Sequence, residues 1–210
     1  MEILFFDELL STQSYLESAV REGDIVEPVA VVAKRQSGGV GSRSNSWYSE
    51  EGDLTASVAF RMDMMPQDLP LGSVSIYFAY IMKESIAKFD ENIWLKWPND
   101  LYIENKIGGI VSRKIKNFII VGIGINMKKN RKFFDSLDIG VSPMILLDMF
   151  LKELETPPKW KDIFSKYRIE FENKKACFAH IEGRRTSLKN SILCEDGSLI
   201  INNRRVFSLR

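Results

Sequence analysis

Histidine is nearly absent from this chain, and cysteine is scarce. The 210 residues include one histidine and two cysteines. A single histidine cannot build a multi-histidine zinc site, and it disfavours a Ser-His-Asp design. That residue, His180, lies in an alternating segment typical of a strand. We therefore expect the chemistry to rest on lysine, arginine, carboxylate, amide and backbone groups.

Other absences narrow the protein class. The cysteines, Cys177 and Cys194, have no C-x-x-C spacing, so we expect both to be reduced and partly buried in a cytoplasmic protein. No apolar run reaches the length of a membrane span (about 20 residues), and the first eight residues lack the basic flank of a signal peptide. The 29 basic and 28 acidic residues nearly balance, so the net charge does not indicate binding to nucleic acid.

Hydrophobic periodicity predicts a mixed order of strands and helices. We expect helices at 12–21, 71–89, 142–154 and 158–171, and strands at 2–6, 28–34, 54–62, 93–96, 106–114 and 117–126. Beyond Asn173 the pattern changes to short alternating pieces at 176–182, 191–195, 199–201 and 206–209. The sequence thus predicts an α+β domain, residues 1–173, with a single mixed sheet flanked by helices, and a small β-barrel-like domain, residues 174–210.

The most informative stretch is Lys96-Trp97-Pro98-Asn99-Asp100, followed closely by Lys106-Ile107-Gly108-Gly109-Ile110. Proline removes a ladder donor and Asn-Asp prefers turns, so a strand has little reason to end this way merely to pack. The carboxylate and amide can order a metal–phosphate complex, while the lysines can bind an anion. The paired glycines allow a ligand to approach the backbone closely.

A glycine-rich segment, residues 36–47, follows a predicted strand. It fails as a Rossmann fingerprint because Ser44 occupies the third glycine position, and no Gly-Lys-Ser/Thr makes it a Walker A loop. A plain surface loop is one interpretation. The other is a ligand-binding loop, in which Arg43 makes forked contacts to phosphate and Trp47 offers a flat face to a nucleobase.

Taken together, these motifs resemble those of biotin–protein ligases. The glycine-rich loop matches the family pattern at Gln36, Gly39, Gly41, Arg43, Trp47 and Ser49, but Val40, Ser42 and Asn45 stand where the family has arginine. The family also carries the KWPND string, the Ser11-Thr12 pair before the first helix, and a Gly-x-Gly-Ile-Asn strand end, here residues 122–126. The resemblance implies a core like that of class II aminoacyl-tRNA synthetases and biotin–lipoate ligases, with an SH3-like C-terminal domain.

The resemblance also implies a site and its ligands, namely biotin, ATP and Mg²⁺. Biotin is expected at Ser11, Thr12, Gln36, Gly39, Gly41, Arg43, Lys106, Gly108, Gly109 and Ile110. ATP and the adenylate are expected at Ser42, Arg43, Trp47, Lys96, Asn99, Lys106, Gly124 and Asn126. Lys106, Arg43 and Asp100 are the expected catalytic residues, and Asp100 with Asn126 would hold the metal ion.

The implied reaction forms biotinyl-5′-AMP and transfers biotin to a lysine of a biotin carboxyl carrier domain in a biotin-dependent carboxylase. With only ten residues before Ser11, no winged helix fits, so DNA is not expected as a partner. A lipoate or octanoate ligase is an alternative, although Ser42-Arg43 replaces the His-Asp pair of that family. A non-catalytic biotin-binding protein is another, given Ser42. A monomer and a weak homodimer both remain open.

Overall fold

The computed structural model describes residues 1–42, 45–127, 136–137 and 139–207. Its helices are α1 (Thr12–Glu22), α2 (Val74–Ala87), α3 (Pro143–Glu153) and α4 (Trp160–Lys174), with 3₁₀ turns at Met62–Met64 and Leu71–Ser73. Its strands are β1 (Glu2–Leu9), β2 (Val29–Gln36), β3 (Gly39–Val40), β4 (Ser46–Trp47), β5 (Leu54–Arg61), β6 (Trp94–Lys96), β7 (Asp100–Tyr102), β8 (Lys106–Ile115), β9 (Phe118–Ile125), β10 (Phe178–Ile181), β11 (Arg184–Ser187), β12 (Ile192–Leu193), β13 (Leu199–Ile201) and β14 (Arg204–Val206).

A mixed sheet organises the chain. Within the described ranges it has seven strands in the order β1-β2-β5-β9-β8-β7-β6. Only β1 and β2 pair in parallel, and α1 connects them; the other neighbours are antiparallel. This arrangement confirms the expected single mixed sheet flanked by helices.

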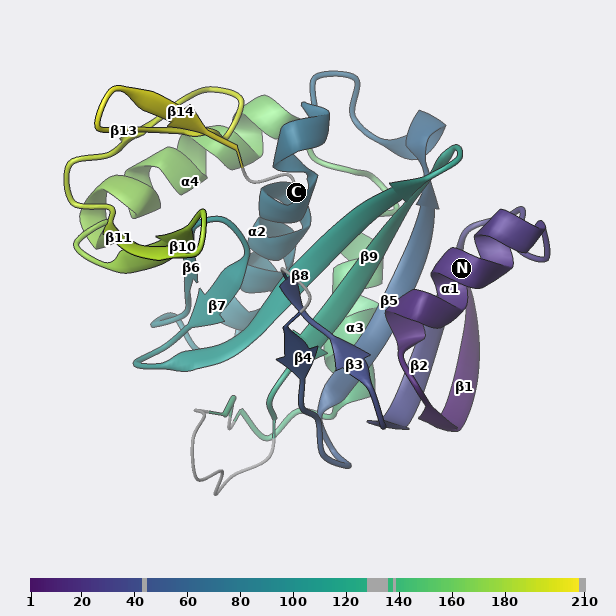
Figure 1. The fold of residues 1–210 in the computed structure, drawn as a ribbon. Helices are drawn as coiled ribbons and strands as arrows, with labels where there is room; N and C mark the ends of the chain where they lie inside the picture. Colours follow the sequence, from purple (N-terminus) through teal and green to yellow (C-terminus); the bar gives the residue numbers. More distant parts are fainter. Residues whose placement is uncertain (43–44, 128–135, 138, 208–210) are drawn as a thin grey trace.

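Each face of the sheet has its own apolar cluster. On one face α1 packs Leu16 and Val20 against residues of β2, β5, β8 and β9. On the other face α2, α3 and α4 cover a larger cluster; Figure 1 shows α2 and α3 behind the sheet and α4 to the left of α2. Because successive strand residues point to opposite faces, the β9 run Phe118–Ile125 serves both clusters.

The helix termini follow the capping residues in the sequence. Ser11 adopts extended backbone angles and its hydroxyl accepts a hydrogen bond from Ser14 N, while Gly23 ends α1 in the left-handed region at φ 95°. Ser142 caps α3 in the same way, and Pro143 follows at the first helical position. The predicted boundaries of these two helices are therefore close to those observed.

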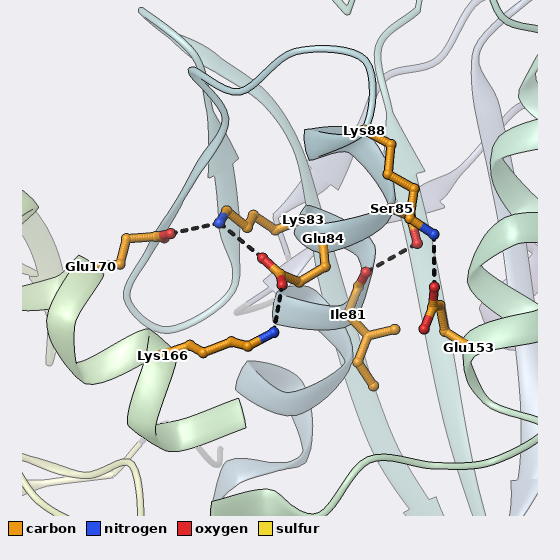
Figure 2. Close-up of polar contacts among 8 residues, drawn as sticks. All are labelled: Ile81, Lys83, Glu84, Ser85, Lys88, Glu153, Lys166 and Glu170. Atoms are coloured by element: carbon orange, nitrogen blue, oxygen red, sulfur yellow. Dashed lines mark hydrogen bonds and ion pairs between the residues drawn. The ribbon is translucent and has the colours of Figure 1, made fainter. Parts of the chain in front are cut away.

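Ion pairs join the helices on the far face of the sheet (Figure 2). Lys83 of α2 contacts Glu170 of α4 at 2.9 Å, and Glu170 also accepts a hydrogen bond from the backbone N of Leu95 in β6. Burial lowers the pKa of Lys83, but the charge and hydrogen bond of Glu170, together with Tyr80 and Glu84, outweigh burial, so the pKa is raised. The contacts connect α2, α4 and β6.

The C-terminal residues form two small sheets beside α4 (Figure 1). One pairs β10 with β11, and the other contains β12, β13 and β14. The sequence patterns did not indicate β11, whose four residues are all polar. Buried Ala179, Leu193 and Leu199 from this region join the same apolar cluster as α2 and α4. The C-terminal region therefore packs directly against the main body of the protein.

Candidate functional site

A small pocket lies where the N-terminus of α1 meets β2, β5, β8 and β9, under the β3–β4 hairpin. Figure 1 shows that hairpin in front of β8 and β9, on the same side of the sheet as α1. The cavity measures ≈ 40 Å³, room for only a few waters. Its lining includes most of the residues predicted from the sequence, namely Ser11, Thr12, Gln36, Gly41, Ser42, Trp47, Asn99, Asp100, Lys106, Gly109 and Gly124.

Polar groups at the end of β2 and the start of α1 are tightly connected. The carbonyl oxygen of the Gln36 side chain accepts hydrogen bonds from Thr12 N at 2.8 Å and from Thr12 Oγ1 at 3.1 Å. Thr12 Oγ1 also lies 2.8 Å from Ser57 Oγ on β5. Ser11 thus caps the helix while its neighbour Thr12 forms part of the polar pocket wall.

The Trp97-Pro98-Asn99-Asp100 segment turns tightly between β6 and β7. The Asn99 carbonyl accepts a hydrogen bond from Ile110 N at 3.0 Å, and its side-chain amide donates to the Ile110 carbonyl. Asn99 is buried, and Asp100 pairs across the ladder with Gly109 of β8. The sequence suggested a turn at Asp100; instead β6 and β8 pair with both edges of residues 100–102 and make them a strand.

The pocket holds one ion pair. Lys106 Nζ lies 2.5 Å from Asp100 Oδ1, and both side chains are partly exposed. Lys106 Nζ is also 5.9 Å from the ring centroid of Trp47. Among the described residues that line the cavity, Lys106 is the only cation. An anionic ligand would therefore compete with Asp100 for this ammonium group.

Trp47 lies directly over a glycine of β9. A Cβ placed on Gly124 would come within 2.5 Å of the indole, so only glycine leaves room for the ring. The indole N–H is buried and has no hydrogen-bond partner within the described part of the chain. Trp47 therefore covers the pocket in this structure and carries a spare donor.

Five predicted residues lie outside the pocket lining. The strand alternation turns Gly108 and Ile110 to the opposite face of β8, where Ile110 is fully buried in the core. Gly39 packs against Trp47 and Gln36 instead. Asn126 is buried just beyond β9, and its backbone N donates to Ile107 O at 2.8 Å.

Lys96 is the fifth of these residues. Its Nζ donates to Tyr102 Oη at 3.0 Å. It also lies near Cys177, where burial raises the pKa of the thiol and the charge of Lys96 partly offsets that rise. Arg43 falls outside the described residues, so its predicted biotin, phosphate and catalytic roles stay predictions.

Sequence analysis missed Gln13, Ser57 and Gly122, which all line the pocket. Gln13 stands one residue after the Ser-Thr pair in an ordinary helical pattern, so no local signal distinguishes it. Gly122 belongs to the alternating glycines of β9, and that spacing was the available clue. Each contributes a small or polar surface to the same wall.

Known proteins resemble this chain in sequence and in fold. Residues 6–130 match the family described as the biotin/lipoate A/B protein ligase family. The chain belongs to this family. A Helicobacter pylori structure described as biotin acetyl coenzyme A carboxylase synthetase with bound biotinylated ATP is 36% identical, with a TM-score of 0.93; the match covers 98% of this chain and 99% of that one.

Other members of the biotin/lipoate ligase family are more distant. The biotin protein ligase of Aquifex aeolicus, in complex with biotin and ATP, has a TM-score of 0.79 at 22% identity and covers 98% of this chain and 94% of that one, which supports the fold. The Bacillus subtilis bifunctional ligase/repressor BirA is 29% identical over 63% of this chain. The match spans only 42% of the length of that protein.

Two further features of this chain can be compared with the sequence analysis, namely membrane-spanning helices and the state of the cysteines. In the part of the chain that the structure describes, no helix is long and apolar enough to cross a membrane. The two cysteines are free and half-buried, as their spacing predicted.

Proposed function

We propose that this protein is an ATP-dependent biotin–protein ligase that forms biotinyl-5′-AMP and then biotinylates a lysine of a biotin carboxyl carrier domain in a biotin-dependent carboxylase. The observation that carries the proposal is the pocket itself, which combines Ser11, Thr12 and Gln36 at one end with Lys106 and Asp100 at the other. The first group suits a polar ring, and the second suits a carboxylate and a phosphate. The likeness to a synthetase with bound biotinylated ATP supports this pairing.

In the first step, a carboxylate oxygen of biotin attacks the α-phosphorus of ATP. An O–P bond forms to the acid, the bond to the β-phosphate bridging oxygen breaks, and pyrophosphate leaves. Lys106 exchanges its contact with Asp100 for the acid and the α-phosphate, and its charge opposes the negative charge that develops in the transition state. Trp47 borders the adenosine and closes the loop over it.

Magnesium would enter with the nucleotide. Among the described residues no group of three His, Cys, Asp or Glu could hold a metal ion. Mg²⁺ needs only one or two carboxylates when phosphates supply further oxygens, and Asp100 in the pocket wall meets that need. When bound, the ion would neutralise phosphate charge and polarise the phosphoryl oxygens.

In the second step, the amine nitrogen of the carrier lysine attacks the acyl carbon of the adenylate. The new C–N bond is an amide, the bond to AMP breaks, and the amine loses a proton. A free lysine, with a pKa of about 10.4, is mostly protonated at neutral pH. Asp100, released from Lys106 by the bound acid, can orient that amine and accept its hydrogen bond. The cytoplasm, where such carriers would be made, is the proposed location.

Pyrophosphate exchange tests the proposal. Labelled pyrophosphate should enter ATP in the presence of biotin and Mg²⁺, and not with lipoate or octanoate. Exchange with lipoate alone would instead assign the protein to the lipoate branch of the family. If folded protein supports no exchange with any acid but binds biotin, the departure at Ser42 is disabling and the protein is a biotin binder.

A further inference from the structure

Gln13 presents a buried acceptor at the pocket. It lies in the first turn of α1 and only 6% of its surface is exposed. Its Nε2 donates to Glu17 Oε1 at 3.1 Å. Its carbonyl oxygen Oε1 is shielded from solvent and has no hydrogen-bond partner within the described ranges. A buried carbonyl without a donor costs free energy, so the position calls for a partner.

The neighbouring carboxylate determines which end of this amide faces Glu17. Ionised Glu17 can only accept hydrogen bonds, so it requires the NH₂ group of Gln13. Glu17 is itself held by Arg113 of β8 at 2.8 Å and by Arg21 at 3.3 Å. The reversed amide would place two oxygens against each other. Oε1 is therefore turned away from Glu17 by charge.

The opposite side of the amide packs against β9, which can accommodate it because that strand carries a glycine there. A Cβ on Gly122 would lie 2.6 Å from Gln13 Oε1, and both residues line the cavity. Thr12, Gln36 and Ser57 already bond to one another in the same wall. Among these four side chains, Gln13 Oε1 is therefore the buried oxygen that has no hydrogen-bond partner within the described residues.

We propose that Gln13 determines specificity in this pocket: its Oε1 accepts a hydrogen bond from a ring N–H of the acid, and Glu17 is the positioning residue that keeps the acceptor in place. The proposal rests on the biotin function above, because the cyclic urea of biotin carries N–H groups. The dithiolane of lipoate and the alkyl chain of octanoate carry none. A site built to hydrogen-bond a substrate rejects analogues that leave its polar group unpaired.

Calorimetric binding of biotin to three variants tests this. Gln13→Met keeps the side-chain length but removes the acceptor, and should weaken biotin about tenfold. Octanoate, measured by competition, should bind Gln13→Met no worse than wild type. Glu17→Gln lets the Gln13 amide rotate, and should weaken biotin by about threefold. Gln67→Met makes the same change on an exposed surface and serves as the matched control.

Kinetics separate this role from a structural one. In pyrophosphate exchange, Gln13→Met should raise the KM for biotin and leave the KM for ATP and kcat near wild type. Unchanged biotin affinity in folded Gln13→Met, or equal losses for biotin and octanoate, would overturn the proposal while the ligase function stands. If Gln13→Met does not fold, an unchanged biotin affinity in Glu17→Gln would overturn it. Wild type that activates lipoate and not biotin would overturn both.

Discussion

The indole N–H of Trp97 donates to the carbonyl of Gly197 at 2.9 Å, across 100 residues of sequence. Ser73 Oγ donates to the carbonyl of Asp196, and Trp160 Nε1 donates to that of Glu195 at 2.9 Å. Three side chains of the main body therefore hold three successive carbonyls of one C-terminal turn. Since Trp97 adjoins Asn99 and Asp100, this turn braces the segment that carries the pocket carboxylate.

Replacing Trp97 should affect both stability and activity. Trp97→Phe removes the donor and leaves the Gly197 carbonyl buried and unpaired, so we expect a loss of about 1–3 kcal/mol in the free energy of unfolding. The exchange rate should fall as well, because Asn99 and Asp100 lose their brace. Urea unfolding and pyrophosphate exchange measure the two effects. Trp94→Phe, which removes a bond to Ile103 within the β6–β7 hairpin, should spare activity.

Lys106 should matter for catalysis far more than for folding. Its ion pair with Asp100 is partly exposed, and such pairs contribute about 0–1 kcal/mol to stability. Removing a cation that opposes developing charge costs about 10²–10³-fold in rate. We therefore expect Lys106→Met to lose exchange activity at nearly unchanged unfolding midpoint. Lys34→Met, which breaks an exposed pair with Asp7, should change neither; equal losses in both variants would contradict the assigned role.

Gly124→Ala should interfere with the closed position of Trp47. The new Cβ would come within 2.5–2.8 Å of the indole, and overpacking of this kind costs about 1–3 kcal/mol. Because Trp47 lies on β4, a strand of only two residues, we expect the ring to move, which would raise the KM for ATP and change tryptophan fluorescence. The same substitution in a Trp47→Ala background should add little. If Gly124→Ala has the same effect with and without the Trp47 ring, the strain lies elsewhere on β9.

Acid should weaken the N-terminus of α4 through Asp68. Its carboxylate accepts hydrogen bonds from Trp160 N and Lys161 N, both at 3.0 Å. Burial raises the pKa of Asp68, but these backbone bonds outweigh it and the pKa lies below the usual 3.8. The stabilisation is therefore present above pH 3.8 and is lost as the pH falls through the lowered pKa.

The Asp68 contribution can be isolated by substitution. Asp68→Asn should cost about 1 kcal/mol at pH 7 and less near pH 3, as measured by urea unfolding at both values. Asp162→Asn changes an exposed aspartate in the first turn of the same helix and should have a smaller effect. A loss for Asp68→Asn that is equal at both pH values would show that the carboxylate charge does not contribute.

Local signals predicted the main sheet and the helix boundaries, and the family resemblance supplied much of the pocket. Ser11, Gly23 and Ser142 are typical helix-capping residues. The helix ends at these positions can therefore be predicted from the local sequence alone. Gln36 and Trp47 were expected from the resemblance to the biotin–protein ligase pattern, and both line the cavity. These features depend on residues close together in the chain.

The remaining features depend on distant contacts. The β7–β8 pairing and its bulge near Leu101 decide whether Gly108 or Gly109 faces the pocket. Two adjacent glycines in the sequence do not indicate which of them it is. The importance of Gln13 emerges only when Glu17 and Gly122 meet it in space. Similarly, Lys96 turns toward Tyr102, which lies on the neighbouring strand.

The glycines of β9 also limit how this protein could be redesigned. Gly122 and Gly124 have no side chain, and the space beside them is filled by Gln13 and Trp47. No substitution on that face of the strand can enlarge the chamber further. An enzyme engineered to accept a bulkier acid would have to gain its volume from another wall, and Val111 of β8 is an aliphatic side chain there that can be shortened.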